Sequence, residues 1–89
     1  MELTLPLTAT GRKYGYIIWG KEVEADLRRL VGDDTVTLIL PGGAEKTQKV
    51  DWKHRRISLG YSVTRGLAED VRAVHLNAPA PGRIHVTFR

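Results

Sequence analysis

The chain has 89 residues, which is enough for one domain, and we expect residues 1–89 to fold as a single unit. Hydrophobic residues make up 42% and charged residues 27%, a balance that argues against disordered and fibrous proteins, and the formal net charge is +4. The absence of cysteine excludes disulfides, thiolate metal sites and a cysteine nucleophile.

The first residues have the alternation of a β-strand. Its apolar face is formed by Leu3, Leu5 and Leu7. Because Pro6 has no N–H to donate to a neighbouring strand, we expect this strand at a sheet edge. Thr10-Gly11 indicates a turn, and the aromatic and β-branched run at 13–19 predicts a second strand. Together the two strands predict an N-terminal hairpin.

One amphipathic helix follows, at about 21–31. The apolar residues that recur on one helical face are Val23, Leu27, Leu30 and Val31. Acidic side chains lie toward the start and arginines toward the end, as the helix dipole favours. Gly20 is suited to the position before the helix, and Gly32 to the left-handed conformation that often ends one.

The second half of the chain predicts a series of strands. The β-branched run at 35–40 predicts a buried strand, and Pro41-Gly42-Gly43 predicts a hairpin turn after it. Further strands are expected at 45–52, 55–63, 71–77 and 83–89, with a helical turn at 67–70 and a loop at 78–82. The inward face of 55–63 would hold Ile57, Leu59, Tyr61 and Val63. The expected fold class is therefore α+β: a mostly antiparallel sheet or small open barrel of about seven strands, with one helix.

The excess of positive charge lies in one segment. Residues 41–66 hold six basic and two acidic side chains, whereas the segments before and after nearly balance. If this segment folds as a hairpin, its cations form a stripe that attracts polyanions, because neutralising phosphates releases condensed counterions. The alternative is a solvated strand whose lysines and arginines serve solubility and edge protection.

One short motif is similar to a catalytic one. Asp34 is followed by Asp51-Trp52-Lys53, as in restriction-type nucleases, where two carboxylates hold Mg²⁺ and a lysine supports the attacking water. The alternative interpretation is that Asp51 caps a turn while Lys53 is exposed. The three histidines lack the spacing of metal ligands: His54, His75 and His85. We therefore expect no catalysis, no bound metal and no cofactor.

The residues favour binding of nucleic acid as the function. Phosphate contacts are expected from Lys46, Lys49, Lys53, Arg55 and Arg56, with secondary contacts from Arg12 and Lys13. The Trp52 ring would stack on a base or support the hairpin. The alternative is a protein-interaction or assembly module that uses a strand edge or the helix, and a homodimer would enlarge the core of so short a chain. No apolar run approaches the roughly 18 residues of a membrane span and the start lacks a signal-peptide basic region, so we expect a cytoplasmic protein.

Residues 11–40 also carry a family resemblance. The order of Gly11-Arg12, Leu27-Arg28, Leu30, Gly32 and Asp33 before the strand at 35–40 is similar to the AbrB/MazE-type swapped-hairpin regulators. Trp19 stands where that family has a proline, and residues 41–89 have no counterpart in its core. The resemblance implies an intertwined DNA-binding dimer with Arg12 and Lys13 at the DNA-facing hairpin.

Overall fold

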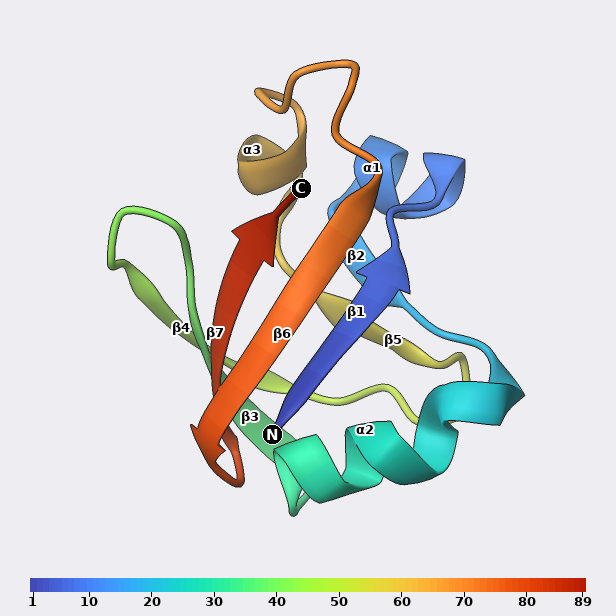
Figure 1. The fold of residues 1–89 in the computed structure, drawn as a ribbon, viewed down its shortest axis with the longest axis vertical. Helices are drawn as coiled ribbons and strands as arrows, with labels where there is room; N and C mark the ends of the chain where they lie inside the picture. Colours follow the sequence, from blue (N-terminus) through green and yellow to red (C-terminus); the bar gives the residue numbers. More distant parts are fainter.

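The computed structural model describes residues 1–89 as two β-sheets with helices beside and between them (Figure 1). The strands are β1 (Glu2–Pro6), β2 (Tyr16–Ile18), β3 (Thr35–Ile39), β4 (Glu45–Lys49), β5 (Arg56–Ser58), β6 (Ala73–Ala80) and β7 (Arg83–Phe88). The helices are α1 (Ala9–Tyr14), the 3₁₀ turn η1 (Lys21–Val23), α2 (Glu24–Val31) and α3 (Tyr61–Thr64). None of them combines the length and the apolar character needed to cross a membrane.

The larger sheet has five strands in the order β1-β6-β7-β3-β4, and β2 pairs with β5 in a second sheet. All neighbours are antiparallel except β3 and β7, which run parallel. The predicted α+β class with a mostly antiparallel sheet is confirmed, and the sheet does not close into a barrel. β1 lies at the edge of this sheet, which is where Pro6 was expected to place it.

The predicted N-terminal hairpin is wrong. Residues 9–14 form helix α1, because the Thr8 hydroxyl accepts a hydrogen bond from the Gly11 N–H at 2.9 Å and so caps the first turn. The helix ends at Gly15, whose φ of 76° is in the left-handed region. Only residues 16–18 of the expected strand at 13–19 are extended, and they pair with β5 instead of β1.

The predicted helix at 21–31 is confirmed as η1 followed by α2. It ends at Gly32, which has a φ of 77° and donates its N–H to the Arg28 carbonyl at 2.8 Å. Leu27 and Leu30 have no exposed surface. Burial of a side chain of this size stabilises the fold by about 1.5–3 kcal/mol.

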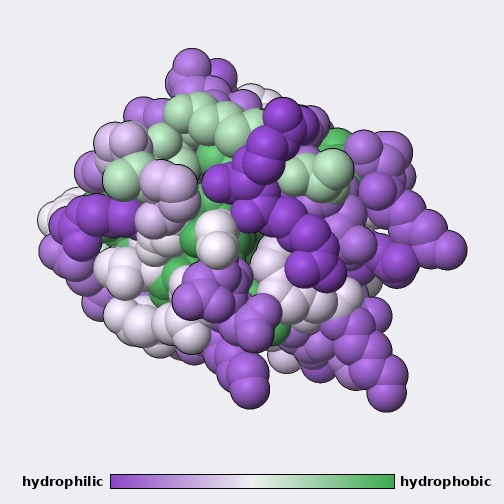
Figure 2. Space-filling model, turned by 90° about the horizontal axis from the view of Figure 1, so that it is seen from below, coloured by the Kyte–Doolittle hydropathy of each residue, from purple (hydrophilic) through white to green (hydrophobic).

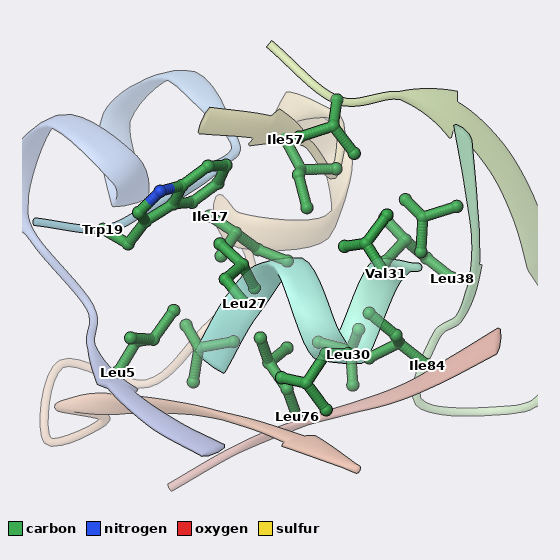
Figure 3. Close-up of a cluster of buried hydrophobic side chains, with 14 of the residues drawn as sticks. Leu5, Ile17, Trp19, Leu27, Leu30, Val31, Leu38, Ile57, Leu76 and Ile84 are labelled. Carbon is green, nitrogen blue, oxygen red and sulfur yellow. The ribbon is translucent and has the colours of Figure 1, made fainter. Parts of the chain in front are cut away.

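The core lies around α2 (Figure 3). Leu76 of β6 and Ile84 of β7 pack on one side of the helix, and Ile17 and Ile57 of the smaller sheet lie on the other. Trp19, at the end of β2, closes one end of the cluster (Figure 3). Each sheet therefore has one face in the core, and the helix that the sequence predicted is the element that joins the two sheets.

The second half of the chain follows the prediction in part. The strand expected at 35–40 is confirmed as β3, although only Val36 and Leu38 are buried in it. The turn at 41–43 is confirmed as well, and β4 returns antiparallel to β3. The strand expected at 55–63 ends at Ser58, because Gly60 has a φ of 97° and residues 61–64 then form α3. Tyr61, predicted to face inward, is exposed. The expected helical turn at 67–70 is not helical, and β6 runs to Ala80 through part of the expected loop at 78–82.

Candidate nucleic-acid interface

The cations of residues 41–66 do not form one stripe, because the segment is divided between two sheets. On β4, Lys46 is paired with the buried Leu38 and Lys49 with the exposed Thr35. Directly paired residues project to the same face, so the two lysines point to opposite sides of the sheet. Lys46 extends inward and its Nζ donates to the Leu59 carbonyl at 3.1 Å.

The two arginines that follow are paired with carboxylates. Arg55 Nε lies 3.5 Å from the Glu24 carboxylate, and Arg55 has a left-handed φ of 53°. Arg56 Nε lies 3.3 Å from the Asp51 carboxylate, while its guanidinium covers the Tyr16 ring at 4.7 Å. Both arginines therefore have intramolecular partners that a phosphate would have to displace or share.

Trp52 is held by its neighbours. Its ring meets the Trp19 ring edge-on, with centroids 5.7 Å apart, and the Arg28 guanidinium covers it at 4.2 Å. Its Nε1 donates to the Asp34 carboxylate at 3.1 Å. This arrangement fits the supporting role that the sequence allowed for this residue. Lys53 beside it and Lys49 are exposed and form no ion pair.

The acidic residues of the nuclease-like motif serve the local structure. Asp51 Oδ1 accepts a hydrogen bond from the backbone N–H of His54 at 3.1 Å, so it caps the turn as the alternative interpretation expected. That hydrogen bond, followed by contact with the His54 ring and the charge of Arg56, lowers the pKa of Asp51 from its ordinary value of 3.8. Asp34 accepts from Trp52. Nowhere do three histidine or acidic side chains gather in a way that could hold a metal ion.

Two backbone segments cross closely at the end of the molecule opposite α2 (Figure 1). The Gly15 carbonyl accepts hydrogen bonds from the N–H groups of Leu59 and Gly60, at 2.6 and 3.1 Å. A Cβ on Gly15 would lie only 2.3 Å from the Gly60 carbonyl carbon, so this approach requires glycine. The crossing places the end of α1 beside the start of α3.

Two exposed tyrosines flank this crossing. Tyr14 ends α1 and is 54% exposed, and Tyr61 begins α3 and is 57% exposed. Each has a cation near its ring: Lys13 Nζ lies 5.3 Å from the Tyr14 centroid, and the Arg65 guanidinium lies 5.9 Å from the Tyr61 centroid. We call the set formed by Lys13, Tyr14, Tyr61 and Arg65 the α1–α3 surface.

Part of this surface was present in the sequence prediction. Lys13 and Arg12 were expected as secondary contacts, and Arg12 anchors the same end by donating to the carbonyls of Ala68 and Val71, at 3.2 and 2.5 Å. Tyr61 was missed, because its spacing matched the inward face of a strand. The signal that could have found it is Gly60, a strand breaker within an otherwise regular alternation.

The face of the larger sheet that is turned away from the core carries a polar hollow of about 440 Å³. His75 lines this hollow and lies between Thr4 and Glu2. Its Nδ1 is 2.9 Å from the Thr4 hydroxyl, and its Nε2 is 2.9 Å from the Glu2 carboxylate. His85 of β7 projects to the same face but lies opposite Asn77, which is two residues after His75 on β6. The two imidazoles are diagonal neighbours, and they do not gather with the Glu2 carboxylate into a group that could hold a metal ion.

Comparison with known proteins adds no assignment. No protein-family model, curated protein or solved structure matches the chain. The similarity of residues 11–40 to the AbrB/MazE-type regulators stays a prediction. Figure 2, which views the molecule from the side of α2, shows hydrophilic residues over most of the outline and apolar atoms only in small areas between them.

Proposed function

We propose that the protein binds single-stranded nucleic acid through the α1–α3 surface. The observation that carries the proposal is the pair of exposed tyrosines, Tyr14 and Tyr61, each with a cation beside its ring, held together by the Gly15–Gly60 crossing. An exposed aromatic ring binds an unpaired base by stacking, and an adjacent cation binds the phosphate that follows it.

The energetics favour a single strand over a duplex. Stacking of a base on an aromatic side chain is worth about 1–3 kcal/mol, and this face is available only when the base is unpaired. The net charge of +4 adds a general attraction to polyanions. A duplex would offer phosphates to Lys13 and Arg65 but no ring face to the tyrosines.

Of the other residues that the sequence predicts as contacts, some are free to bind nucleic acid and others are not. Arg56 covers Tyr16, and because β2 follows Gly15 and β5 precedes Gly60, this pair lies along the path leading to the crossing. Lys49 and Lys53 keep free ammonium groups for phosphate. The side chains of Lys46, Arg55 and Trp52 already have partners within the fold, so we assign them no direct contact.

The proposal is tested by fluorescence anisotropy with a fluorescein-labelled oligothymidylate of about 15 nucleotides, a length within the site sizes of small single-strand binders. We expect Tyr14→Ala and Tyr61→Ala each to weaken binding by about 5- to 150-fold, the equivalent of one lost stack. Lys13→Ala should reduce the dependence of log K on log salt by about 0.7, the contribution of one phosphate contact on a single strand.

Matched controls locate the interface. Lys21→Ala removes an equal charge from η1, a different part of the molecule, and should leave the salt dependence unchanged. A Lys49→Ala/Lys53→Ala variant tests the central segment: loss of binding there, with wild-type affinity in both tyrosine variants, would move the interface to that segment and contradict the proposal. No binding of the oligonucleotide at low salt would end it.

A further inference from the structure

β1 has one unpaired edge. Met1 and Ala78 exchange two backbone hydrogen bonds, and the Leu7 N–H donates to the Arg72 carbonyl, so odd-numbered residues of β1 face β6. In an antiparallel pair the alternate residues face away from the partner strand. The N–H and C=O groups of Glu2 and Thr4 therefore point outward from the sheet edge, and no backbone group pairs with them.

A cleft of about 280 Å³ adjoins this edge from Thr4 onward, and Glu2 lies just outside it. From β1 it is lined by Thr4 and Pro6, which project to one face of the sheet, and by Leu5, which projects to the other. A cavity that contacts side chains of both faces must lie beside the strand, and the other side of β1 is occupied by β6. The opposite wall is the segment from Ile18 to Val23, with Trp19 within it.

The cleft has one charged side chain. Glu22 is the only ionisable residue among those that line it, while Leu5, Ile18 and Val23 give it apolar walls. Trp19 also lines it, and its indole Nε1 is buried without a hydrogen-bond partner. A negative charge, apolar walls and a row of free backbone groups together match an extended peptide with alternating basic and apolar side chains.

We infer that this cleft binds such a peptide, which adds to β1 as a sixth strand of the larger sheet. The backbone of the peptide would pair with Glu2 and Thr4, its apolar side chains would lie against Ile18 and Val23, and a lysine would approach Glu22. Main-chain pairing of this kind gives affinity, and the alternating side chains give specificity. The proposal concerns a different surface from the one assigned to nucleic acid, so each can fail separately.

The test uses fluorescein-labelled Val-Lys-Val-Lys-Val-amide and anisotropy. We expect Thr4→Pro to weaken binding about tenfold or more, because it removes the outward N–H at the centre of the edge while leaving the backbone hydrogen bonds between β1 and β6 intact. Thr4→Val, the matched control, also loses the hydroxyl that contacts His75 but keeps the N–H, and should bind as the wild type does. Glu22→Gln should reduce the preference over Val-Glu-Val-Glu-Val-amide.

A second readout does not depend on how a variant folds. The same peptide with an N-methyl group on its central valine cannot donate from that position, and we expect it to bind the wild-type protein about tenfold more weakly. Equal binding of both peptides, or of Thr4→Pro and Thr4→Val, would overturn the proposal. So would a dimer in light scattering that Thr4→Pro dissociates, because the edge would then belong to a second copy of the chain.

Discussion

Replacement of Gly15 by alanine tests the backbone crossing beneath the α1–α3 surface. The new Cβ would lie 2.3 Å from the Gly60 carbonyl carbon and 2.4 Å from its oxygen, and the residue has a φ of 76°. The left-handed conformation costs an L-residue about 1–2 kcal/mol. Overpacking against a backbone that cannot rotate away adds about 1–3 kcal/mol. We therefore expect Gly15→Ala to lower the free energy of unfolding by about 2–5 kcal/mol.

Gly42→Ala separates the two contributions. Gly42 also has a positive φ, of 93°, but a Cβ there would have no atom within 4 Å. This variant should lose only the conformational part, about 1–2 kcal/mol. Urea denaturation followed by tryptophan fluorescence measures both, since Trp19 and Trp52 are packed together in the fold. If the two variants were equally destabilised, the contact between Gly15 and Gly60 would not be the rigid crossing described above.

Two further changes test the turn and the core. Because the pKa of Asp51 is lowered in the folded state, its contribution to stability is present above the ordinary value of 3.8 and is lost as the pH falls below it. As the pH is lowered below 4, the Tm of Asp51→Asn, measured by circular dichroism, should therefore fall less steeply than that of the wild type. The control is Asp70→Asn, which removes a carboxylate that accepts no hydrogen bond. Its Tm should fall as steeply as that of the wild type. Leu27→Ala should cost about 2–5 kcal/mol in urea denaturation because the side chain is fully buried. Leu3→Ala at the half-buried start of β1 should cost less, and an equal loss would place Leu27 outside the essential core.

The parts of the fold that the sequence predicts well depend on local signals. The helix at 21–31 has a regular apolar period and a glycine at its end, and both features act within one segment. The β3–β4 hairpin is similarly set by Pro41-Gly42-Gly43 between its strands. Neither the helix nor this hairpin depends on contacts with residues far away in the sequence.

The errors arise where pairing is distant. The run at 13–19 has the composition of a strand, but its first two residues belong to helix α1, which Thr8 and Gly15 cap at its two ends. The residues that are extended, 16–18, pair with β5, about forty residues later in the chain. A strand prediction carries no information on that partner. The alternation of apolar and polar residues in 55–63 continues through Gly60 and so predicts one strand, although the backbone turns at Gly60 and the strand has already ended.

Of the α1–α3 surface, the sequence predicted only Lys13 as a contact, and for residues 41–66 it predicted the net charge but not its arrangement. Composition shows an excess of cations in residues 41–66, yet not where each side chain points. One part of the answer was available: Lys46 and Lys49 are an odd number of residues apart, so on a single strand they must face opposite sides. The pairing of Arg55 with Glu24 was not available, because it depends on how α2 packs beside β5.

The partnership of β1 with β6 has a consequence for synthesis in the cell. Thr4 and His75, which lie opposite each other, are separated by 71 residues. At the usual elongation rate of about 5–20 residues per second, the first strand waits about 4–14 s for its neighbour to emerge from the ribosome. During that interval the leucines of β1 have no sheet to cover them, so their apolar side chains stay exposed to solvent until β6 is made.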